Sequence, residues 1–287
     1  MTTVETLGAA TIRGSESFAL GSAQVDETFL VDVAAPLNHS GKALPVIYVL
    51  DGSQGFGLAA QTVSQLQLGR LLPAAIVVGI GYRAEMSRVR SLRLRDFTPD
   101  ADGAYLARVA GTPDAPADGV APGGAAAFLR FVQEELKPFI ESRYAVDRTD
   151  QTLVGMSLGG LFALHTLFDA PRSFQRYLAL SPSIWWHDRA ILARESAFAR
   201  QAPDLPVNLF LSIGALEEAE YASARMVSNL YELHARLAQR PYKTLRLAME
   251  VFAGETHGSV YPAALSRGLR TVFGTAPGFS DWATPPG

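Results

Sequence analysis

One five-residue stretch combines residue types that could do chemistry: Gly155-Met156-Ser157-Leu158-Gly159, a G-x-S-x-G pattern. A serine hydroxyl is a poor nucleophile unless a base removes its proton and its oxygen is held exposed. A strained strand-to-helix turn provides the exposure, and the flanking glycines leave room for the chain to pass close to itself. Glycine-rich turns also match this pattern by chance, so the chemistry depends on partners elsewhere in the sequence.

A nucleophilic serine requires a base, and four histidines follow Ser157. His165 lies in an apolar helical pattern, His187 follows two tryptophans, and His234 lies in the middle of another helical pattern. His257 lies in a glycine-bounded loop, AGETHGSV, directly after the last predicted strand. Hydrolases with this strand–turn–helix serine carry their histidine last in chain order. We therefore predict that His257 is the base.

The base in turn requires a carboxylate that orients the imidazole and stabilises its charged form. The chain order Ser, Asp or Glu, His places this group between Ser157 and His257. The loop after the predicted strand 207–213 contains Glu217 and Glu218. We predict Glu217 as the acid and keep Glu218 in reserve. The alternative is that both glutamates are solvated residues that open the next helix.

An oxyanion hole requires N–H donors around the serine. Leu158 would supply one from the start of its helix, and Gly52 or Ser53 a second from the turn VLDGSQGFG after an early strand. This glycine-rich turn could instead cradle a phosphate. However, it lacks the lysine and hydroxyl of the G-x-x-x-x-G-K-[ST] pattern, and its match to G-x-G-x-x-G also fails.

Two further groups could contact a substrate. Trp185 and Trp186 could wall an acyl pocket, since aromatic walls suit apolar or aryl groups, or they could pack against a lid. Five arginines between Arg83 and Arg95 offer forked donors for carboxylate or phosphate and planes that stack on aryl rings. Salt bridges within the same segment are the alternative for most of them, and Arg95 could simply pin the segment through Asp96.

The elements that must position these residues alternate between apolar runs and helical patterns. This alternation predicts an α/β fold, a mostly parallel central sheet flanked by helices, in a single domain over residues 1–287. Pro138 is expected to kink or divide a long helix. The predicted strands are 25–33, 44–50, 74–79, 152–154, 176–183, 207–214 and 245–252, and the predicted helices are 123–144, the stretch from 158, 220–239 and about 260–273.

One long segment interrupts this alternation. Residues 82–122 show no clear periodic element, and loops of this length in a compact domain are usually functional or disordered. The segment follows the predicted strand 74–79, at whose carboxyl end an open α/β sheet binds its ligand. We predict that it forms an active-site loop or cap, and that residues 275–287 form an extended tail.

The composition excludes several classes of function. The 287 residues carry a formal net charge of -3, which gives no reason to expect nucleic acid or an anionic membrane as partner. Without any cysteine, disulfides and a thiol nucleophile are excluded. No metal-ligand pattern occurs, so we expect neither metal nor cofactor. No apolar run approaches the roughly 18 residues that span a bilayer, and no signal peptide is recognised. A cytoplasmic location is expected, and the oligomeric state stays open.

As a set, these motifs resemble the putative-esterase family of α/β-hydrolases, above all its siderophore-esterase branch. Feruloyl esterases, S-formylglutathione hydrolases and mycolyltransferases also belong to this family. The resemblance spans about residues 40–260 and implies Ser157 as nucleophile, His257 as base and the Leu158 N–H in the oxyanion hole. Glu217 stands where aspartate is commoner. The shared motifs are YVLDG (48–52), RDFTP (95–99), VGMSLGGLFAL (154–164), LALSPSIWW (178–186), LSIGALEE (211–218) and THG (256–258).

The resemblance implies hydrolysis of a small-molecule carboxylic ester through an acyl-Ser157 intermediate, without a cofactor. Siderophore-type and aryl esters are the expected substrates. Three alternatives stay open: an acyltransferase that uses the same Ser–His machinery, a peptidase, and a non-catalytic binding protein that keeps the α/β-hydrolase fold.

Overall fold

The computed structural model describes residues 11–36, 41–99, 102–109 and 120–274. Within these residues, eight strands form one sheet in the order β1-β2-β4-β3-β5-β6-β7-β8. The pairs β1–β2 and β2–β4 are antiparallel, and every pair from β4 to β8 is parallel. The strands are β1 Ser15–Ser22, β2 Glu27–Ala34, β3 Leu44–Leu50, β4 Ile76–Tyr82, β5 Val146–Met156, β6 Arg176–Leu180, β7 Asn208–Gly214 and β8 Arg246–Phe252.

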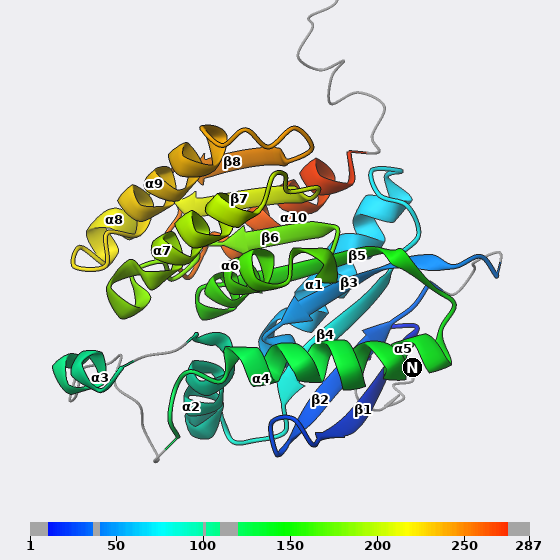
Figure 1. Ribbon diagram of the computed structural model, residues 1–287. Helices are drawn as coiled ribbons and strands as arrows, with labels where there is room; N and C mark the ends of the chain where they lie inside the picture. The colour runs from blue at the N-terminus through cyan, green and yellow to red at the C-terminus, as the bar shows by residue number, and fades with distance from the viewer. Residues whose placement is uncertain (1–10, 37–40, 100–101, 110–119, 275–287) are drawn as a thin grey trace, which may run out of the picture.

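Helices cover both faces of this sheet (Figure 1). On one face, α1 (Gly52–Leu68) and α10 (Tyr261–Phe273) pack over a cluster of buried side chains that includes Val49 and Val154. On the other face, a larger cluster lies under the remaining long helices. These and the shorter helical elements are α2 Met86–Phe97, α3 Gly103–Val109, α4 Ala125–Arg130, η1 Phe131–Leu136, α5 Lys137–Arg143, α6 Leu158–Asp169, η2 Pro171–Ser173, α7 Trp186–Gln201, α8 Glu217–Glu220 and α9 Met226–Ala238.

The burial of the neighbouring strands β3 and β4 explains why the sequence pattern identifies them. Every residue of β3 and of β4 is buried, because helices cover both of their faces. In β3, Tyr48 and Leu50 belong to the larger cluster, whereas Ile47 and Val49 point to the α1 and α10 face. The predicted α/β fold with a mostly parallel sheet is confirmed.

The prediction that residues 82–122 lack periodic elements is wrong. Residues 86–97 form α2 and residues 103–109 form α3. The buried positions of α2 include Val89, Leu92, Asp96 and Phe97, which have helical spacing. The interleaved arginines and the buried aspartate concealed this spacing in the sequence. Residues 110–119 and the predicted tail, 275–287, lie outside the described residues.

The predicted helix 123–144 is continuous, and Pro138 does not divide it. The elements α4, η1 and α5 follow one another without a break, and η1 has the wider π-helical winding. A proline inside a helix removes one hydrogen bond and its ring collides with the carbonyl four residues earlier. Because the π-helical turn directly precedes α5, we attribute the continuity of this helix to the wider winding before Pro138.

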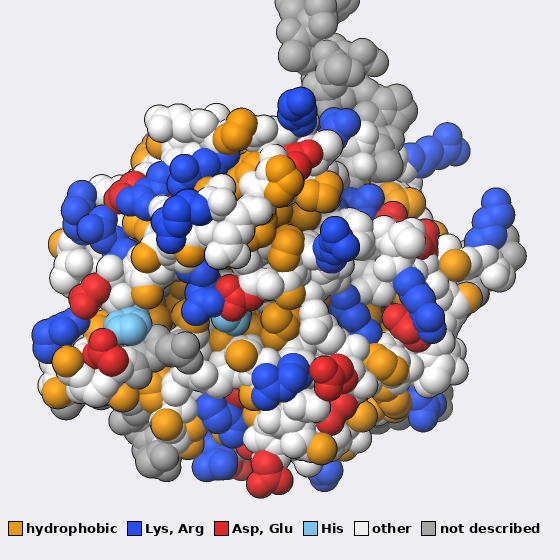
Figure 2. Space-filling view, in the orientation of Figure 1, with side chains coloured by type: hydrophobic (Ala, Val, Ile, Leu, Met, Phe, Trp, Pro, Cys, Tyr) orange, Lys and Arg blue, Asp and Glu red, His pale blue; other side chains and the backbone are white. Residues whose placement is uncertain are grey.

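Charged side chains of both signs cover the outer helices. On the face that Figure 2 shows, basic and acidic side chains lie interspersed, with hydrophobic side chains between them. Ion pairs in the structure include Arg194 with Asp169 and Arg189 with Glu232. Within the described part of the chain, no helix has the length and hydrophobicity that crossing a membrane requires.

Candidate active site

The turn between β5 and α6 has the strained geometry that the G-x-S-x-G pattern predicts. Strand β5 ends at Met156 and α6 begins at Leu158, so Ser157 alone connects them. Its φ of 60° and ψ of -120° lie outside the regions that residues with a side chain favour. A Cβ on Gly155 would lie 2.1 Å from the carbonyl oxygen of Gly159, so the strand and helix can meet only at a glycine.

Main-chain hydrogen bonds fix Ser157 in place. Its N–H donates to the carbonyl of Leu180 at 3.0 Å, and its own carbonyl accepts the N–H groups of Leu161 and Ser183, each at 3.0 Å. Its hydroxyl oxygen lies 3.4 Å from Ser183 Oγ. Among the described residues, no hydrogen bond joins Ser157 to His257; catalytic hydrogen bonds are often long without substrate and shorten in the reacting complex.

The predicted acid and base are in direct contact. Glu217 Oε2 lies 2.7 Å from His257 Nδ1, and the Glu217 side chain is fully buried. Its other oxygen, Oε1, accepts hydrogen bonds from Ser181 Oγ and from the Gly214 N–H, each at 2.7 Å. These bonds fix the carboxylate against the imidazole. With Nδ1 as the donor to Glu217, Nε2 has a lone pair that can accept a proton.

Ser181 connects this pair to Ser157. Its neighbour Leu180 accepts the Ser157 N–H, and Ser181 itself donates to Glu217. Ser181 is fully buried and has a left-handed φ of 42°, which turns the chain away from the end of β6. In the sequence, Ser181 stands out only as part of the LALSPSIWW motif, which does not reveal its contact with Glu217.

Glu218, the second candidate for the acid, makes different contacts. Its Oε2 accepts the N–H groups of Val227 at 2.8 Å and Ser228 at 3.0 Å, and its Oε1 accepts the Ser228 hydroxyl. Burial alone would raise the pKa of Glu218, but these hydrogen bonds outweigh it and lower that pKa. Glu218 therefore caps the first turn of α9 and does not contact His257.

Two helix N-termini meet where the oxyanion hole is expected. Leu158 is the first residue of α6. A Cβ on Gly159 would lie 3.4 Å from the Cβ of Leu50, which ends β3 two residues before α1 begins. Gly52 and Ser53 open α1, and within the described residues their N–H groups donate to no main-chain acceptor. The free N–H groups of two helices thus lie close together at this end of the sheet.

The Ser53 hydroxyl does not take part in this arrangement. Its Oγ accepts the N–H of Tyr82 at 3.3 Å, which ties the start of α1 to the end of β4. Gly52 is also packed against β4, because a Cβ there would lie 2.6 Å from the Ile80 nitrogen. Ser53 can therefore contribute its backbone N–H to an oxyanion hole, while its side chain holds the turn.

An ion pair beside these termini was not singled out from the sequence. Arg93 binds Asp51 through two hydrogen bonds, Nε to Oδ1 at 2.5 Å and Nη2 to Oδ2 at 2.9 Å. Asp51 Oδ2 also lies 3.6 Å from the position of a Cβ on Gly159. Burial alone would lower the pKa of Arg93, but the Asp51 carboxylate outweighs it and raises that pKa. The signal was present in the YVLDG motif, which ends with Asp51-Gly52.

The four predicted substrate-binding residues have different surroundings in the structure. Trp186 is buried, and its ring packs edge-on against Tyr105 of α3, whereas Trp185 is only partly buried. Arg95 donates to the buried Asp96, from Nε to Oδ1 at 2.6 Å, which favours the ion-pair interpretation over substrate binding. Arg83 is exposed at the end of β4.

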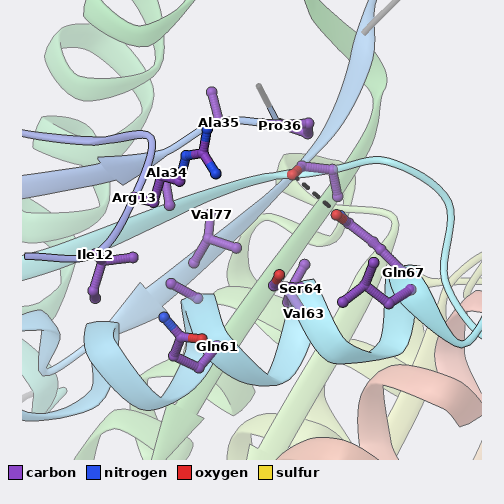
Figure 3. Close-up of a pocket in the computed structure, with 13 residues that line it drawn as sticks. Ile12, Arg13, Ala34, Ala35, Pro36, Gln61, Val63, Ser64, Gln67 and Val77 are labelled. Carbon is purple, nitrogen blue, oxygen red and sulfur yellow. Dashed lines mark hydrogen bonds between the residues drawn. The ribbon is translucent and has the colours of Figure 1, made fainter. Parts of the chain in front are cut away.

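A cavity of about 420 Å³ lies away from the serine, between α1 and the end of β2 (Figure 3). Ala34 and Val77 line it, and these two residues pair at the beginning of β4. The cavity is therefore at the amino ends of the parallel strands, whereas Ser157 follows the carboxyl end of β5.

Among the described residues there is no group of three or more His, Asp or Glu side chains that could hold a metal ion.

Comparison with known proteins identifies the family of the chain. A family model described as "Putative esterase" matches residues 22–271. The chain belongs to this esterase family. This esterase is 37% identical to the ferri-bacillibactin esterase BesA of Bacillus subtilis over 275 residues, which cover 92% of the chain and 91% of that protein. It is 34% identical to the siderophore enterobactin esterase of Emericella nidulans over 276 residues, with 85% and 89% covered.

Solved structures have the same fold. This esterase is similar to the BES protein from Bacillus cereus, with a TM-score of 0.79 and 34% identity over 95% of this chain and 99% of the other. It is also similar to the siderophore hydrolase EstB from Aspergillus nidulans, with a TM-score of 0.77 and 30% identity over 97% and 100% of the two chains. The protein is a carboxylic-ester hydrolase of the α/β-hydrolase fold, as the motifs predicted.

Proposed function

We propose that this esterase cleaves siderophore-type esters through an acyl-Ser157 intermediate, with His257 as base and Glu217 as the acid that orients it. The observation that carries the proposal is the 2.7 Å contact between His257 Nδ1 and the buried Glu217 carboxylate. With Nδ1 engaged as a donor, Nε2 is the nitrogen that can accept the proton of Ser157. The strained turn at Ser157 supports its role as nucleophile.

The reaction has two halves. Ser157 Oγ attacks the ester carbonyl carbon while His257 Nε2 takes the serine proton, and that proton then passes to the leaving alcohol oxygen as its bond to carbon breaks. Water attacks the acyl-serine in the second half, again with His257 as base. The N–H groups of Leu158 and of Gly52 or Ser53 stabilise the oxyanion in both halves.

The names of the relatives support the substrate class. The Bacillus subtilis relative is a ferri-bacillibactin esterase and the Emericella nidulans relative an enterobactin esterase. We extend this class to the present chain, with a ferric trilactone siderophore as the expected substrate and simple aryl esters as slower ones. The predicted cytoplasmic location remains a prediction, which fractionation of cells would test.

Intact-mass analysis with a fluorophosphonate tests the mechanism. The wild-type protein should gain one adduct and hydrolyse p-nitrophenyl esters, whereas Ser157→Ala should gain none and lose all but a small residual activity. Ser142→Ala, which changes a serine of α5, is the control and should behave like the wild type. Near-normal turnover by Ser157→Ala would refute the acyl-serine mechanism.

The substrate class is tested separately, by following ferric and iron-free trilactones by mass spectrometry. Cleavage of the trilactone in preference to an aryl ester supports the proposal. If aryl esters are cleaved and trilactones are neither bound nor cleaved, the substrate class is wrong while the mechanism stands. An added alcohol shows whether the acyl group is transferred to an acceptor instead of water.

A further inference from the structure

Tyr221 lies directly beside the proposed base. Its ring centroid is 5.5 Å from that of the His257 imidazole, with the two planes at 76°. Unlike the buried aromatic residues of the core, Tyr221 is 42% exposed. Burial of part of the side chain and the carboxylates of Glu220 and Glu217 raise the pKa of Tyr221, so its phenol stays neutral. An uncharged aromatic surface is therefore available next to the imidazole.

The position of this ring is fixed by the segment that also fixes the base. Glu217 contacts His257 Nδ1, and Glu220 Oε2 accepts the His257 main-chain N–H at 2.9 Å. The Tyr221 N–H donates to the Glu217 carbonyl at 3.1 Å, so the tyrosine directly continues α8. Three residues of one short segment thus contact His257. Glu217 is buried, whereas Glu220 and Tyr221 are exposed, and of the three only Tyr221 has an aromatic side chain.

The chemistry determines which part of an ester lies near His257. The imidazole delivers its proton to the leaving alcohol oxygen, so that oxygen must come within hydrogen-bonding distance of Nε2, about 3 Å. A substituent on this oxygen then extends past the imidazole and its immediate neighbours. The acyl part, in contrast, stays attached to Ser157. An exposed ring in contact with His257 is therefore placed to meet the alcohol part of the substrate.

We propose that Tyr221 forms a leaving-group subsite, which binds an apolar or aryl substituent on the alcohol side of the ester. This inference rests on the proposed function. A contact between the Tyr221 ring and an aromatic substituent should raise kcat/KM for that ester about 3- to 10-fold over an ester without the ring. The attack of an alcohol on the acyl-enzyme is the reverse of acylation, so the same subsite selects the acceptor alcohol.

The test compares two esters of one acid, benzyl butyrate and 2-methoxyethyl butyrate, whose alcohols have similar acidity. Tyr221→Ala should lower kcat/KM for the benzyl ester about 3- to 10-fold and leave the methoxyethyl ester nearly unchanged. Tyr221→Phe should keep the preference, because it keeps the ring. Tyr231→Ala removes another exposed tyrosine, on α9, and should change neither ester.

A second readout separates binding from positioning. The butyryl-enzyme no longer holds the leaving group, so Tyr221→Ala should keep the wild-type rate of hydrolysis of this intermediate, measured after a p-nitrophenyl butyrate burst. It should also lose the preference for benzyl alcohol over 2-methoxyethanol as acceptor. Tyr221→Leu, which retains bulk, repeats the test if the alanine variant has a lowered Tm.

Two results would overturn the subsite. An equal loss for both esters, with slower hydrolysis of the acyl-enzyme, would mean that Tyr221 only positions His257. An unchanged benzyl preference in Tyr221→Ala and Tyr221→Leu would mean that the ring does not contact the leaving group. Failure of the proposed function is distinguishable from both, because wild-type protein would then gain no fluorophosphonate adduct and form no acyl-enzyme.

Discussion

The Glu217 carboxylate and the His257 imidazole lie 2.7 Å apart although they are 40 residues apart in the chain. Glu217 follows β7 and His257 follows β8, and these neighbouring parallel strands bring both residues to one edge of the sheet. The adjacent Glu218 points to α9 instead. Substitutions of these two glutamates therefore form a matched pair. We expect changes at Glu217 to affect catalysis and changes at Glu218 to affect stability.

Glu217→Gln should reduce kcat about 10³- to 10⁴-fold, because a neutral amide cannot stabilise the imidazolium and can favour the wrong tautomer. Glu218→Gln is the matched control and should keep kcat within about twofold, since Glu218 does not contact His257. Steady-state kinetics with a p-nitrophenyl ester measures both. Equal activity of Glu217→Gln and the wild type would point to a Ser–His dyad.

Ser181→Ala should weaken catalysis without removing it. The variant deletes one of two hydrogen bonds to Glu217 Oε1 and leaves the Gly214 N–H in place. Hydrogen bonds to charged groups contribute about 1.5–3 kcal/mol, and we expect a loss of that order in the free energy of unfolding. Chemical denaturation and the pH profile of kcat check this together. An unchanged stability and profile would mean that Ser181 does not hold the carboxylate.

Glu218→Gln should lower stability at neutral pH, by about 1 kcal/mol as for other lost helix caps. The lowered pKa of Glu218 means that its contribution is complete above the ordinary glutamate pKa of about 4.3 and is lost as the pH falls through the folded-state value. The stability difference between the two proteins should therefore be constant near neutral pH and shrink below about pH 4. Urea denaturation from pH 3 to 7 measures it, and a difference that grows on acidification would contradict the assignment.

Gly155→Ala should prevent the turn at Ser157 from forming. Its Cβ would collide with the Gly159 carbonyl oxygen, a backbone atom that cannot move without displacing α6. We expect a loss of at least 1–3 kcal/mol together with loss of activity. Gly57→Ala on α1 is the control, because its Cβ would make ordinary contact at 3.7 Å and should not destabilise the protein. Thermal unfolding compares the two, and a stable, active Gly155→Ala protein would argue against a tightly packed turn.

Much of this site followed from the sequence because its residues lie where local patterns change. Ser157 marks the switch from strand to helical period, and His257 lies in a loop directly after the last strand. Strands buried on both faces appear in the sequence as continuous apolar runs. These runs alone were enough to locate β3 and β4. Chain order then limited the acid to the residues between Ser157 and His257.

Other features depended on contacts between distant segments. Which of Glu217 and Glu218 contacts His257 depends on where each side chain points. Neighbouring side chains on a helix diverge by about 100°, so only the fold shows which one faces the imidazole. The sequence left Arg95 open between substrate binding and an ion pair with Asp96, and the fold shows that ion pair. The sequence thus determined which groups can react and roughly where they lie along the chain. The tertiary structure decided which of them touch, because hydrogen bonds and ion pairs act over a few ångströms that sequence spacing does not specify.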